Sequence, residues 1–235
     1  MIAQMIRTNT IADDLANVDT TGFKKQVSVF RSSKLTPIYR VTGESGPFIG
    51  SMASGTRFVQ NETNFSQGSL QETNNPLDLA IEGPDFFSVK TPGGDFYTRN
   101  GAFFLNSKGE LVTQNGYPVL DIHKHNIVLG PGTVQIDQNG TIAVNGTPVS
   151  QIQLVTLPQT QQIYKMSDNL YRYTGTTGKQ QGTVRQGFLE SSNVNAIKEL
   201  VKLIQAERTY DASSKAVTEE DNALKLAVTN VGTGQ

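Results

Sequence analysis

Apolar residues recur at helical spacing along the last fifth of the chain, and this pattern predicts one long amphipathic helix. Ser191-Ser192-Asn193 offers side chains that can cap the start of a helix, and Gly232 can end one. The segment between them amounts to about 38 residues, roughly 57 Å at 1.5 Å per residue. Four of the apolar positions follow one another at seven-residue spacing, so the stripe needs a partner helix. The stripe consists of Val194, Ile197, Val201, Ile204, Leu203, Tyr210, Val217 and Leu224.

The first residues of the chain supply a candidate for that partner. Glycine and proline interrupt helices, and both are absent before Gly22 and again between Phe188 and Val231. The N-terminal segment carries a looser apolar stripe, and we expect the two end helices to pack as a coiled-coil-like pair. The N-terminal stripe consists of Ile2, Met5, Ile6, Ile11, Ala12 and Leu15.

The middle of the chain has the pattern of short strands separated by turns. All nine prolines lie between Pro37 and Pro158, and runs rich in Val, Ile, Leu and Phe alternate with pairs that favour hairpin turns. The sequence from Gly43 to Ser69 is rich in Gly, Ser, Asn and Thr, which predicts an extended loop or arm. The turn pairs are Asn100-Gly101, Lys108-Gly109, Asn115-Gly116, Asn139-Gly140 and Asn145-Gly146.

A weak internal repeat supports the hairpin prediction. Residues 105–113, with the sequence LNSKGELVT, resemble residues 136–144, with the sequence IDQNGTIAV. Such a repeat is expected when one hairpin is used twice in a sheet. The segment 91–95, TPGGD, lacks the Lys-Ser/Thr ending of a phosphate-binding loop and is expected to be a hairpin turn as well.

Together these patterns predict an α+β fold in three parts. Residues 1–27 form the N-terminal helix and turn of a terminal helical domain. Residues 28–186 form a β-rich central domain of hairpins, with an extended loop near 43–69. Residues 187–235 form the C-terminal helix of the terminal helical domain.

Composition and charge exclude several classes of function. Twenty Lys and Arg residues against twenty-one Asp and Glu leave a net charge of −1, so no long-range field gathers nucleic acid or anionic lipid. The absence of Cys excludes disulfides, thiolate metal sites and a cysteine nucleophile. Residues 1–7 lack the features of a cleaved secretory signal, and no apolar run approaches membrane-spanning length. We therefore expect no nucleic-acid partner and no direct membrane insertion.

The two histidines are the main candidates for a metal site. His123 and His125 stand two residues apart, so on a strand both would project from one face, and Asp121 could add a third ligand. The sequence holds no further His or Cys to complete a typical transition-metal shell. We therefore expect an exposed turn here, with no metal and no other cofactor.

The acidic residues offer candidates for catalysis, because a glycosidase needs two carboxylates that face each other across a cleft. The candidates stand beside Gly or Pro, where acidic side chains are usually solvated, and we expect no catalytic role for them. They are Glu82, Asp85, Asp95 and Glu110.

A small basic cluster lies after the first predicted helix. Its members are Lys24, Lys25, Arg31 and Lys34. Few aromatic residues accompany them, which favours a solvated face over a nucleic-acid platform.

The stretch after the first predicted helix also carries a recognisable signature. Residues 16–24, with the sequence ANVDTTGFK, resemble the Ala-Asn-x-x-Thr-x-Gly-Phe/Tyr-Lys signature of the axial proteins of the bacterial flagellum, and among them of the rod proteins. Physically, Asn17 can close a helix, Gly22 can adopt a positive φ, and Phe23 can fill a hydrophobic groove. We expect these three residues to contribute to an assembly interface together with the apolar stripe of the C-terminal helix.

The resemblance extends over the middle and the C-terminal end of the chain. Two departures occur on the helices: Asp13-Asp14 stands where Asn-Asn is common, and Glu207 stands where Gln is usual. Charge at a packed helix seam can alter the contacts between subunits. The similar segments are 67–70, 75–83, 86–87, 97–101, 111–118, 186–194, 208–210 and 214–215.

The resemblance implies a structural role without catalysis or a small-molecule substrate. Members of this family pass through the flagellar export apparatus without a cleaved signal and polymerise outside the inner membrane. By this likeness the chain is a subunit of the basal-body rod, of proximal or distal type. It would assemble with copies of itself and with other rod or hook proteins into the shaft that transmits motor torque.

Three alternatives remain at this stage. A hook-type subunit shares the motifs, although hook subunits generally carry an additional large outer domain and the middle of this chain is short. A cell-wall-remodelling enzyme associated with the rod would need a carboxylate pair. An adhesive β-domain with helical tails would need a ligand for its middle region.

Overall fold

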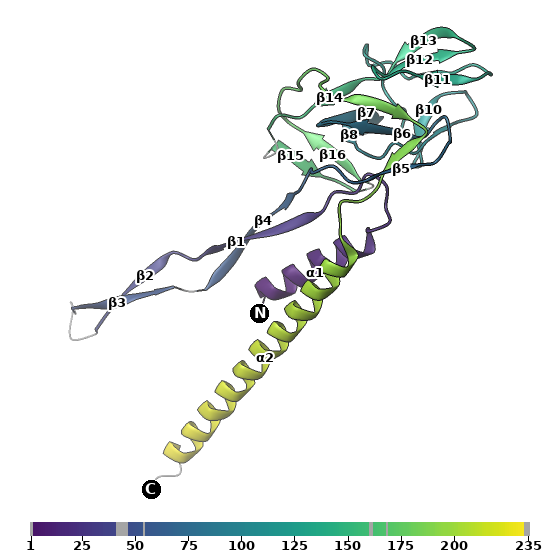
Figure 1. Ribbon diagram of the computed structural model, residues 1–235. Coiled ribbons are helices and arrows are strands. Elements are labelled where there is room, and N and C mark those ends of the chain that lie inside the picture. Colours follow the sequence, from purple (N-terminus) through teal and green to yellow (C-terminus); the bar gives the residue numbers. More distant parts are fainter. Residues whose placement is uncertain (1, 41–46, 54, 160–161, 168, 233–235) are drawn as a thin grey trace. The chain divides into compact units, whose positions relative to one another are not determined.

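The computed structural model divides the chain into two compact units, each built from segments that lie far apart in the sequence (Figure 1). The helical unit consists of residues 1–15, 26–62 and 196–235, and the β unit consists of residues 16–25 and 63–195. The structure describes residues 2–40, 47–53, 55–159, 162–167 and 169–232.

These units divide the chain at other places than the boundaries expected from the sequence. Residues 16–25, expected with the N-terminal helix, belong to the β unit, because Gly22 N–H donates a hydrogen bond to the carbonyl oxygen of Glu190. Residues 28–62, expected in the central domain, belong to the helical unit. The structure therefore places residues 16–25 in the β unit and residues 28–62 in the helical unit.

The helical unit contains both predicted helices, which confirms the α+β class. Helix α1 spans Ile2–Ala16, and helix α2 spans Ala196–Gly232 as one continuous helix of 37 residues. No helix in the described ranges is apolar enough over a sufficient length to cross a membrane. A coiled-coil packing between α1 and α2 remains a prediction.

Helix α2 begins after the residues that we expected to cap it. The N–H of Ser191 donates to the carbonyl oxygen of Ser69, and the side-chain amide of Asn193 donates to the carbonyl oxygen of Asn64. Both residues therefore bind the segment at residues 64–69, which belongs to the β unit. Asn195, which directly precedes the helix, is of a type preferred at this position.

The helical unit also contains an arm made of two strand pairs, β1 with β4 and β2 with β3 (Figure 1). The strands pair antiparallel in β2–β3, where Leu35 lies opposite Ala53. At its base, the N–H of Gln26 donates to the carboxylate of Asp14 on α1 at 2.9 Å. The strand bounds are β1 (Gln26–Ser32), β2 (Leu35–Tyr39), β3 (Phe48–Ala53) and β4 (Thr56–Thr63).

Of the two alternatives expected near residues 43–69, an extended loop or an arm, the described residues show an arm of paired strands. Within that range the structure shows strands β3 and β4, whereas residues 43–46 and 54 lie outside the described part of the chain. The polar composition concealed these strands, although Phe48, Phe58 and Val59 supply apolar residues of the kind that favour strands.

In the described part of the chain, the β unit holds a five-stranded sheet of order β14-β7-β8-β16-β15, a three-stranded sheet β11-β12-β13, and three strand pairs. Pairs β17–β6 and β18–β5 bring the last strands before α2 beside the first strands of the unit. The bounds are β5 (Leu70–Glu72), β6 (Leu79–Glu82), β7 (Asp85–Thr91), β8 (Gly94–Thr98), β9 (Phe103–Leu105), β10 (Leu111–Thr113), β11 (Val134–Ile136), β12 (Thr141–Val144), β13 (Thr147–Gln151), β14 (Leu154–Thr156), β15 (Ile163–Lys165), β16 (Leu170–Tyr173), β17 (Thr183–Gln186) and β18 (Phe188–Glu190).

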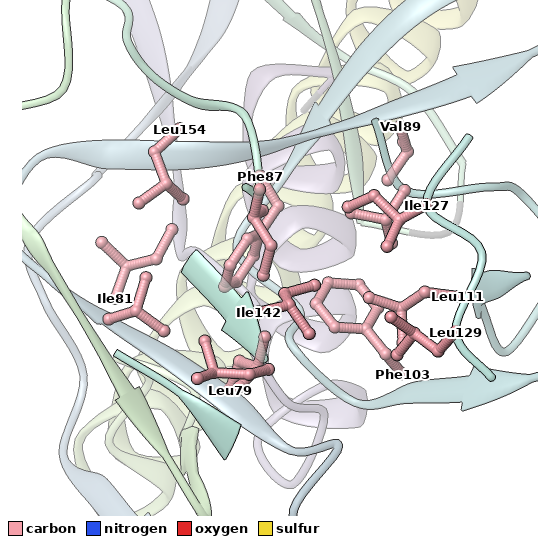
Figure 2. Close-up of a cluster of buried hydrophobic side chains, with 14 of the residues drawn as sticks. Leu79, Ile81, Phe87, Val89, Phe103, Leu111, Ile127, Leu129, Ile142 and Leu154 are labelled. Carbon is pink, nitrogen blue, oxygen red and sulfur yellow. The ribbon is translucent and has the colours of Figure 1, made fainter. Parts of the chain in front are cut away.

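The main hydrophobic core lies in the β unit, and Figure 2 shows it in close-up. Phe87 and Phe103 meet edge to face, with ring centroids 5.1 Å apart. Because successive strand residues point to opposite faces, Phe87 enters this core whereas Phe86 joins a second cluster with Tyr171. Each such side chain contributes roughly 1.5–3 kcal/mol on burial, so these clusters stabilise the unit. The labelled core residues are Leu79, Ile81, Phe87, Val89, Phe103, Leu111, Ile127, Leu129, Ile142 and Leu154.

The predicted repeat is confirmed and has a third copy. In the loop between β9 and β10, the side-chain oxygen of Asn106 accepts hydrogen bonds from the N–H groups two and four residues on. Asp137 makes the same two bonds between β11 and β12, and Asp121 makes them in a loop that the repeat did not reveal. Each loop has a residue of positive φ three positions after the Asn or Asp: Gly109, Lys124 and Gly140. Lysine in place of glycine concealed the third copy.

Most of the predicted turns are confirmed, and one is wrong. Residues 91–95 join β7 to β8, and Asn145-Gly146 joins β12 to β13. Asn100-Gly101 does not connect two paired strands. Its glycine instead lies against β6, since a Cβ on Gly101 would stand 1.7 Å from the carbonyl oxygen of Leu79.

The three similar loops generate a stability prediction. A non-glycine residue at positive φ costs about 1 kcal/mol, so Gly140→Ala should lower the free energy of unfolding by about that amount. Lys124→Gly should leave this free energy unchanged or raise it by up to about 1 kcal/mol, because its φ of 64° then carries no steric penalty. Urea unfolding followed by circular dichroism measures both changes.

The matched control is Lys124→Asn, which loses the same exposed ion pair with Asp95 but tolerates positive φ. A loss of stability in Lys124→Gly that exceeds the loss in Lys124→Asn would contradict the assignment of a common loop.

Candidate functional site

Three segments that are distant in the sequence meet at one buried carboxylate in the β unit. An oxygen of the Glu190 carboxylate accepts hydrogen bonds from Lys24 Nζ at 2.6 Å and from Gly68 N–H at 2.8 Å. The other carboxylate oxygen lies 3.4 Å from Arg99 Nη1, and the backbone oxygen accepts from Gly22 N–H at 2.7 Å. We call these five residues the clasp. Glu190 is 1% exposed, so its charge is held by protein groups.

The two cations of the clasp are buried with the carboxylate. Lys24 is fully buried and also donates to the carbonyl oxygen of Ser66 at 2.9 Å. Burial lowers the pKa of the Lys24 ammonium, although the Glu190 carboxylate acts in the opposite direction. Arg99 donates to the carbonyl oxygen of Gly83 at 2.7 Å, and burial lowers the pKa of its guanidinium as well. Removing one member of such a group leaves an uncompensated buried charge.

Both glycines of the clasp are needed for close approach of the backbone. Gly22 has a φ of 67°, and a Cβ on it would lie 2.4 Å from the backbone nitrogen of Asn100. A Cβ on Gly68 would lie 2.0 Å from the carbonyl oxygen of Ser191. A side chain at either position would therefore push the three segments apart.

Phe23 and Asn193 make further contacts next to the clasp. Phe23 is 2% exposed, and Lys165 Nζ lies 3.8 Å from the centre of its ring. The side-chain oxygen of Asn193 accepts from Lys25 N–H at 2.8 Å, while its nitrogen donates to the carbonyl oxygen of Ser66 at 2.9 Å. Asn193 therefore joins the segment of Lys25 to the segment of Ser66 with one side chain.

A second buried carboxylate corrects one of our expectations. We expected Asp85 to be solvated beside Pro84, but it is fully buried. Its carboxylate accepts from the hydroxyl of Thr156 and from the N–H groups of Gln181 and Gly182, at 2.8 and 2.6 Å. The sequence pattern failed here because a Pro-Asp pair at the start of β7 resembles a surface turn.

The other candidate acids have separate surroundings. Glu110 accepts from the side-chain amides of Asn106 and Asn126, and these hydrogen bonds lower the pKa of its carboxyl. Asp95 pairs with Lys124 at 2.8 Å, and Glu82 is exposed.

The histidines lie in the third of the similar loops and not on a strand. His123 and His125 donate their backbone N–H groups to Asp121, and the side chain of His125 is 79% exposed. One carboxylate oxygen of Asp121 accepts both bonds, as in the other two loops. The described residues contain no group of three or more His, Cys, Asp or Glu side chains that could hold a metal ion.

The basic cluster expected as one solvated face is also corrected. Lys24 is buried in the clasp, whereas Arg31 and Lys34 lie exposed on or beside the strands of the arm. Lys24 and the arm belong to different units, so the four residues do not act as one surface of the β unit.

The predicted assembly residues fall into three groups by exposure. Five members of the α2 stripe are exposed, from Ile204 at 42% to Ile197 at 77%. Leu203 and Tyr210 are half-buried, as is Asn17. In contrast, Gly22, Phe23 and Val194 are buried inside the β unit, and a part for them in subunit contacts remains a prediction. The exposed five are Ile197, Val201, Ile204, Val217 and Leu224.

Sequence reasoning missed the roles of Arg99, Gly68 and Glu190, although all three stand in segments that carry the resemblance. The sequence held one signal of a buried charge, because Glu190 is an acidic residue between apolar Leu189 and the turn before α2. Its partners are 91 and 166 positions away, which no local pattern reveals.

Comparisons with known proteins bear directly on this arrangement. Residues 1–24 match the model of the flagella basal body rod protein, residues 80–144 the flagellar hook protein FlgE/F/G D1 domain, and residues 185–229 the flagellar basal body rod FlgEFG protein C-terminal model. The chain is 35% identical to the flagellar basal-body rod protein FlgG of Buchnera aphidicola, over 95% of this chain and 93% of that protein. The chain belongs to the family of flagellar basal-body rod proteins.

Two further relatives show the breadth of this rod-protein family. The chain is 36% identical to FlgF of Caulobacter vibrioides, over 94% of this chain and 90% of that protein. It is 33% identical to FlgG of Borreliella burgdorferi, over 97% and 94% of the two chains. The chain is therefore a structural rod protein of the flagellar basal body.

The three charged residues of the clasp come from the three matched segments of this rod protein. Lys24 ends the first match, Arg99 lies in the second, and Glu190 lies in the third. The clasp therefore joins residues from all three matched segments within the β unit.

The clasp generates a second stability prediction. Glu190→Ala should lower the free energy of unfolding of the β unit by about 3–5 kcal/mol, because it leaves Lys24 and Arg99 buried without their carboxylate. Thermal and urea unfolding measure the change. Glu72→Ala, which removes an exposed carboxylate from the paired strand β5, is the matched control and should change the free energy by less than about 0.5 kcal/mol. Equal effects of the two substitutions would contradict the clasp.

Proposed function

We propose that this rod protein assembles with its neighbours through two apolar surfaces, the stripe of α2 and the arm. The observation that carries the proposal is the exposure of large apolar side chains on both elements. Ile197 of α2 is 77% exposed and Phe48 of the arm is 61% exposed. Soluble monomers rarely expose large apolar surfaces unless they bind a partner.

The length of α2 supports a role in assembly. A helix of 37 residues is roughly 56 Å long at 1.5 Å per residue. Helices gain most of their stability by packing an apolar face, and a helix with its stripe in water is marginal. Neighbouring subunits would cover that stripe. The exposed apolar residues of α2 are Ile197, Leu200, Val201, Ile204, Val217, Leu224, Leu226 and Val228.

Part of the stripe fits a pairing with α1, and we propose the coiled-coil-like pair on this basis. Leu203 and Tyr210 are half-buried, and Tyr210 lines a cavity together with Met5 and Asn9 of α1. Glu207, one of the departures from the family pattern, lines the same cavity. A seam with a polar gap of this kind leaves space for a side chain from another subunit.

The arm supports assembly for a different reason. A two-stranded ribbon is marginally stable alone, and each of its strands has a free edge that can pair with another chain. Ribbon β2–β3 nevertheless carries a row of exposed apolar side chains. We propose that contact with a neighbouring subunit stabilises it. These side chains are Leu35, Ile38, Tyr39, Phe48, Ile49 and Met52.

The residues of the N-terminal signature contribute mainly by shaping the subunit. Gly22, Phe23 and Val194 are buried, so we propose that they set the path of the chain on which the interface depends. Asn17 keeps an accessible surface and stays a candidate for direct contact.

Several finer roles belong to the same proposal. We propose that the chain passes through the flagellar export apparatus without a cleaved signal, and that it assembles with other rod and hook proteins. The polymer would transmit motor torque across a repeating interface. We propose no catalytic step, and the burial of Asp85 with three hydrogen-bond donors speaks against the cell-wall enzyme.

The assembly proposal predicts the effect of charge on the stripe. Val217→Glu and Leu224→Glu together should abolish concentration-dependent association, because burial of an unpaired carboxylate costs several kcal/mol. Light scattering of the purified chain at rising concentration measures association, and complementation of a rod-deficient strain measures motility. The β unit should keep its unfolding transition, since neither residue belongs to it.

The matched control changes two exposed polar positions on the same helix, Thr218→Glu and Asn222→Glu, and should leave association and motility intact. Normal motility of the Val217→Glu, Leu224→Glu variant would contradict the proposed interface.

A further inference from the structure

A cavity of about 350 Å³ lies in the β unit beside the N-terminal signature. Of the ten residues that line it, nine carry an amide or hydroxyl group and none carries a charge. Its volume falls in the range of about 300–1,000 Å³ typical of small-molecule sites. The cavity contains no residue of the clasp, and Asn17 is the one lining residue that is also a candidate for subunit contact.

Several polar groups of this cavity lack a hydrogen-bond partner within the described ranges of the chain. Asn169 is only 8% exposed, and its side-chain amide bonds to no described residue. Asn100 uses its amide oxygen as an acceptor within the chain and leaves its amide N–H groups unused. The side chains of Gln114, Asn115 and Tyr117 likewise have free donors and acceptors. These side-chain groups line the cavity without a described protein partner, so a ligand with complementary donors and acceptors can bind them.

The lining restricts the chemistry of that ligand. Each Asn or Gln side chain offers two donors and an acceptor, and each hydroxyl offers both. A charged ligand would enter without a counter-charge, and an apolar ligand would leave the amides unpaired. A neutral ligand with closely spaced donors and acceptors satisfies both conditions, and the hydroxyl groups around a sugar ring have this arrangement. We propose that the cavity binds a neutral saccharide.

Titration of the full chain with two disaccharides tests this proposal and distinguishes two classes of sugar. N,N′-diacetylchitobiose carries acetamido groups, and cellobiose has hydroxyls at the same positions. Amide chemical shifts in nuclear magnetic resonance spectra should change in a saturable way with at least one of them, at residues that line the cavity. Stronger binding of the first identifies an amino sugar, and stronger binding of the second a plain hexose.

Two substitutions remove lining amides with little expected effect on folding. Asn169→Gly keeps the backbone free to adopt its φ of 56°, and Asn115→Ala acts at an exposed turn. Each should weaken binding by roughly fivefold, as expected for one neutral hydrogen bond. Asn139→Ala, an exposed asparagine in a different loop, should leave binding unchanged.

The proposal is overturned if neither disaccharide produces saturable shifts up to its solubility limit, or if Asn169→Gly and Asn115→Ala bind as well as the unchanged chain. If Asn169→Gly does not fold, Asn115→Ala decides. Shifts of the lining residues that depend on protein concentration and not on sugar would assign the cavity to a second copy of this chain and would also overturn the proposal. Failure of the sugar titration would leave the proposed assembly through α2 and the arm untouched, because all lining residues lie in the β unit.

Discussion

The burial of one carboxylate, Glu190, is the constraint on which the rest of this structure depends. A charge removed from water must be matched by hydrogen bonds and by opposite charge, or it destabilises the fold by several kcal/mol. Here the match requires Lys24 from the N-terminal signature, Arg99 from the central sheet region and the backbone of Gly68. Since none of these groups is near Glu190 in sequence, the carboxylate can be satisfied only when the three segments meet in one arrangement.

This constraint places the elements that carry the proposed function. The chain leaves the β unit on both sides of the clasp, toward α1 before residue 16 and toward α2 after residue 195. The β unit is stabilised by an internal hydrophobic core and by buried polar groups that are largely paired. The arm and α2 show the opposite balance, since their apolar side chains are exposed. A well-packed body with two incompletely covered elements is the composition expected of a subunit that completes its packing by assembly.

The sequence predicted those elements whose structure depends on neighbouring residues. The absence of Gly and Pro located both helices, and the Asn-Gly and Lys-Gly pairs other than Asn100-Gly101 located turns of the β unit. The third similar loop was missed because Lys124 adopts a conformation for which Gly is the usual signal. Asp85 and Lys24 were placed in solvent because their partners lie 42 to 166 positions away, and periodicity carries no information on such contacts. The resemblance to rod proteins marked the segments that meet in the clasp but not the reason why they meet.

Hydrogen exchange of backbone amides tests the central role of the clasp most directly. The N–H of Gly22 bonds to the backbone oxygen of Glu190, and the N–H of Gly68 bonds to its carboxylate. If the clasp joins the three segments, both amides exchange only when the whole β unit unfolds, at the rate of core amides such as that of Leu111. Exchange of Gly22 or Gly68 at the rate of amides in the arm, while the core stays protected, would contradict this account.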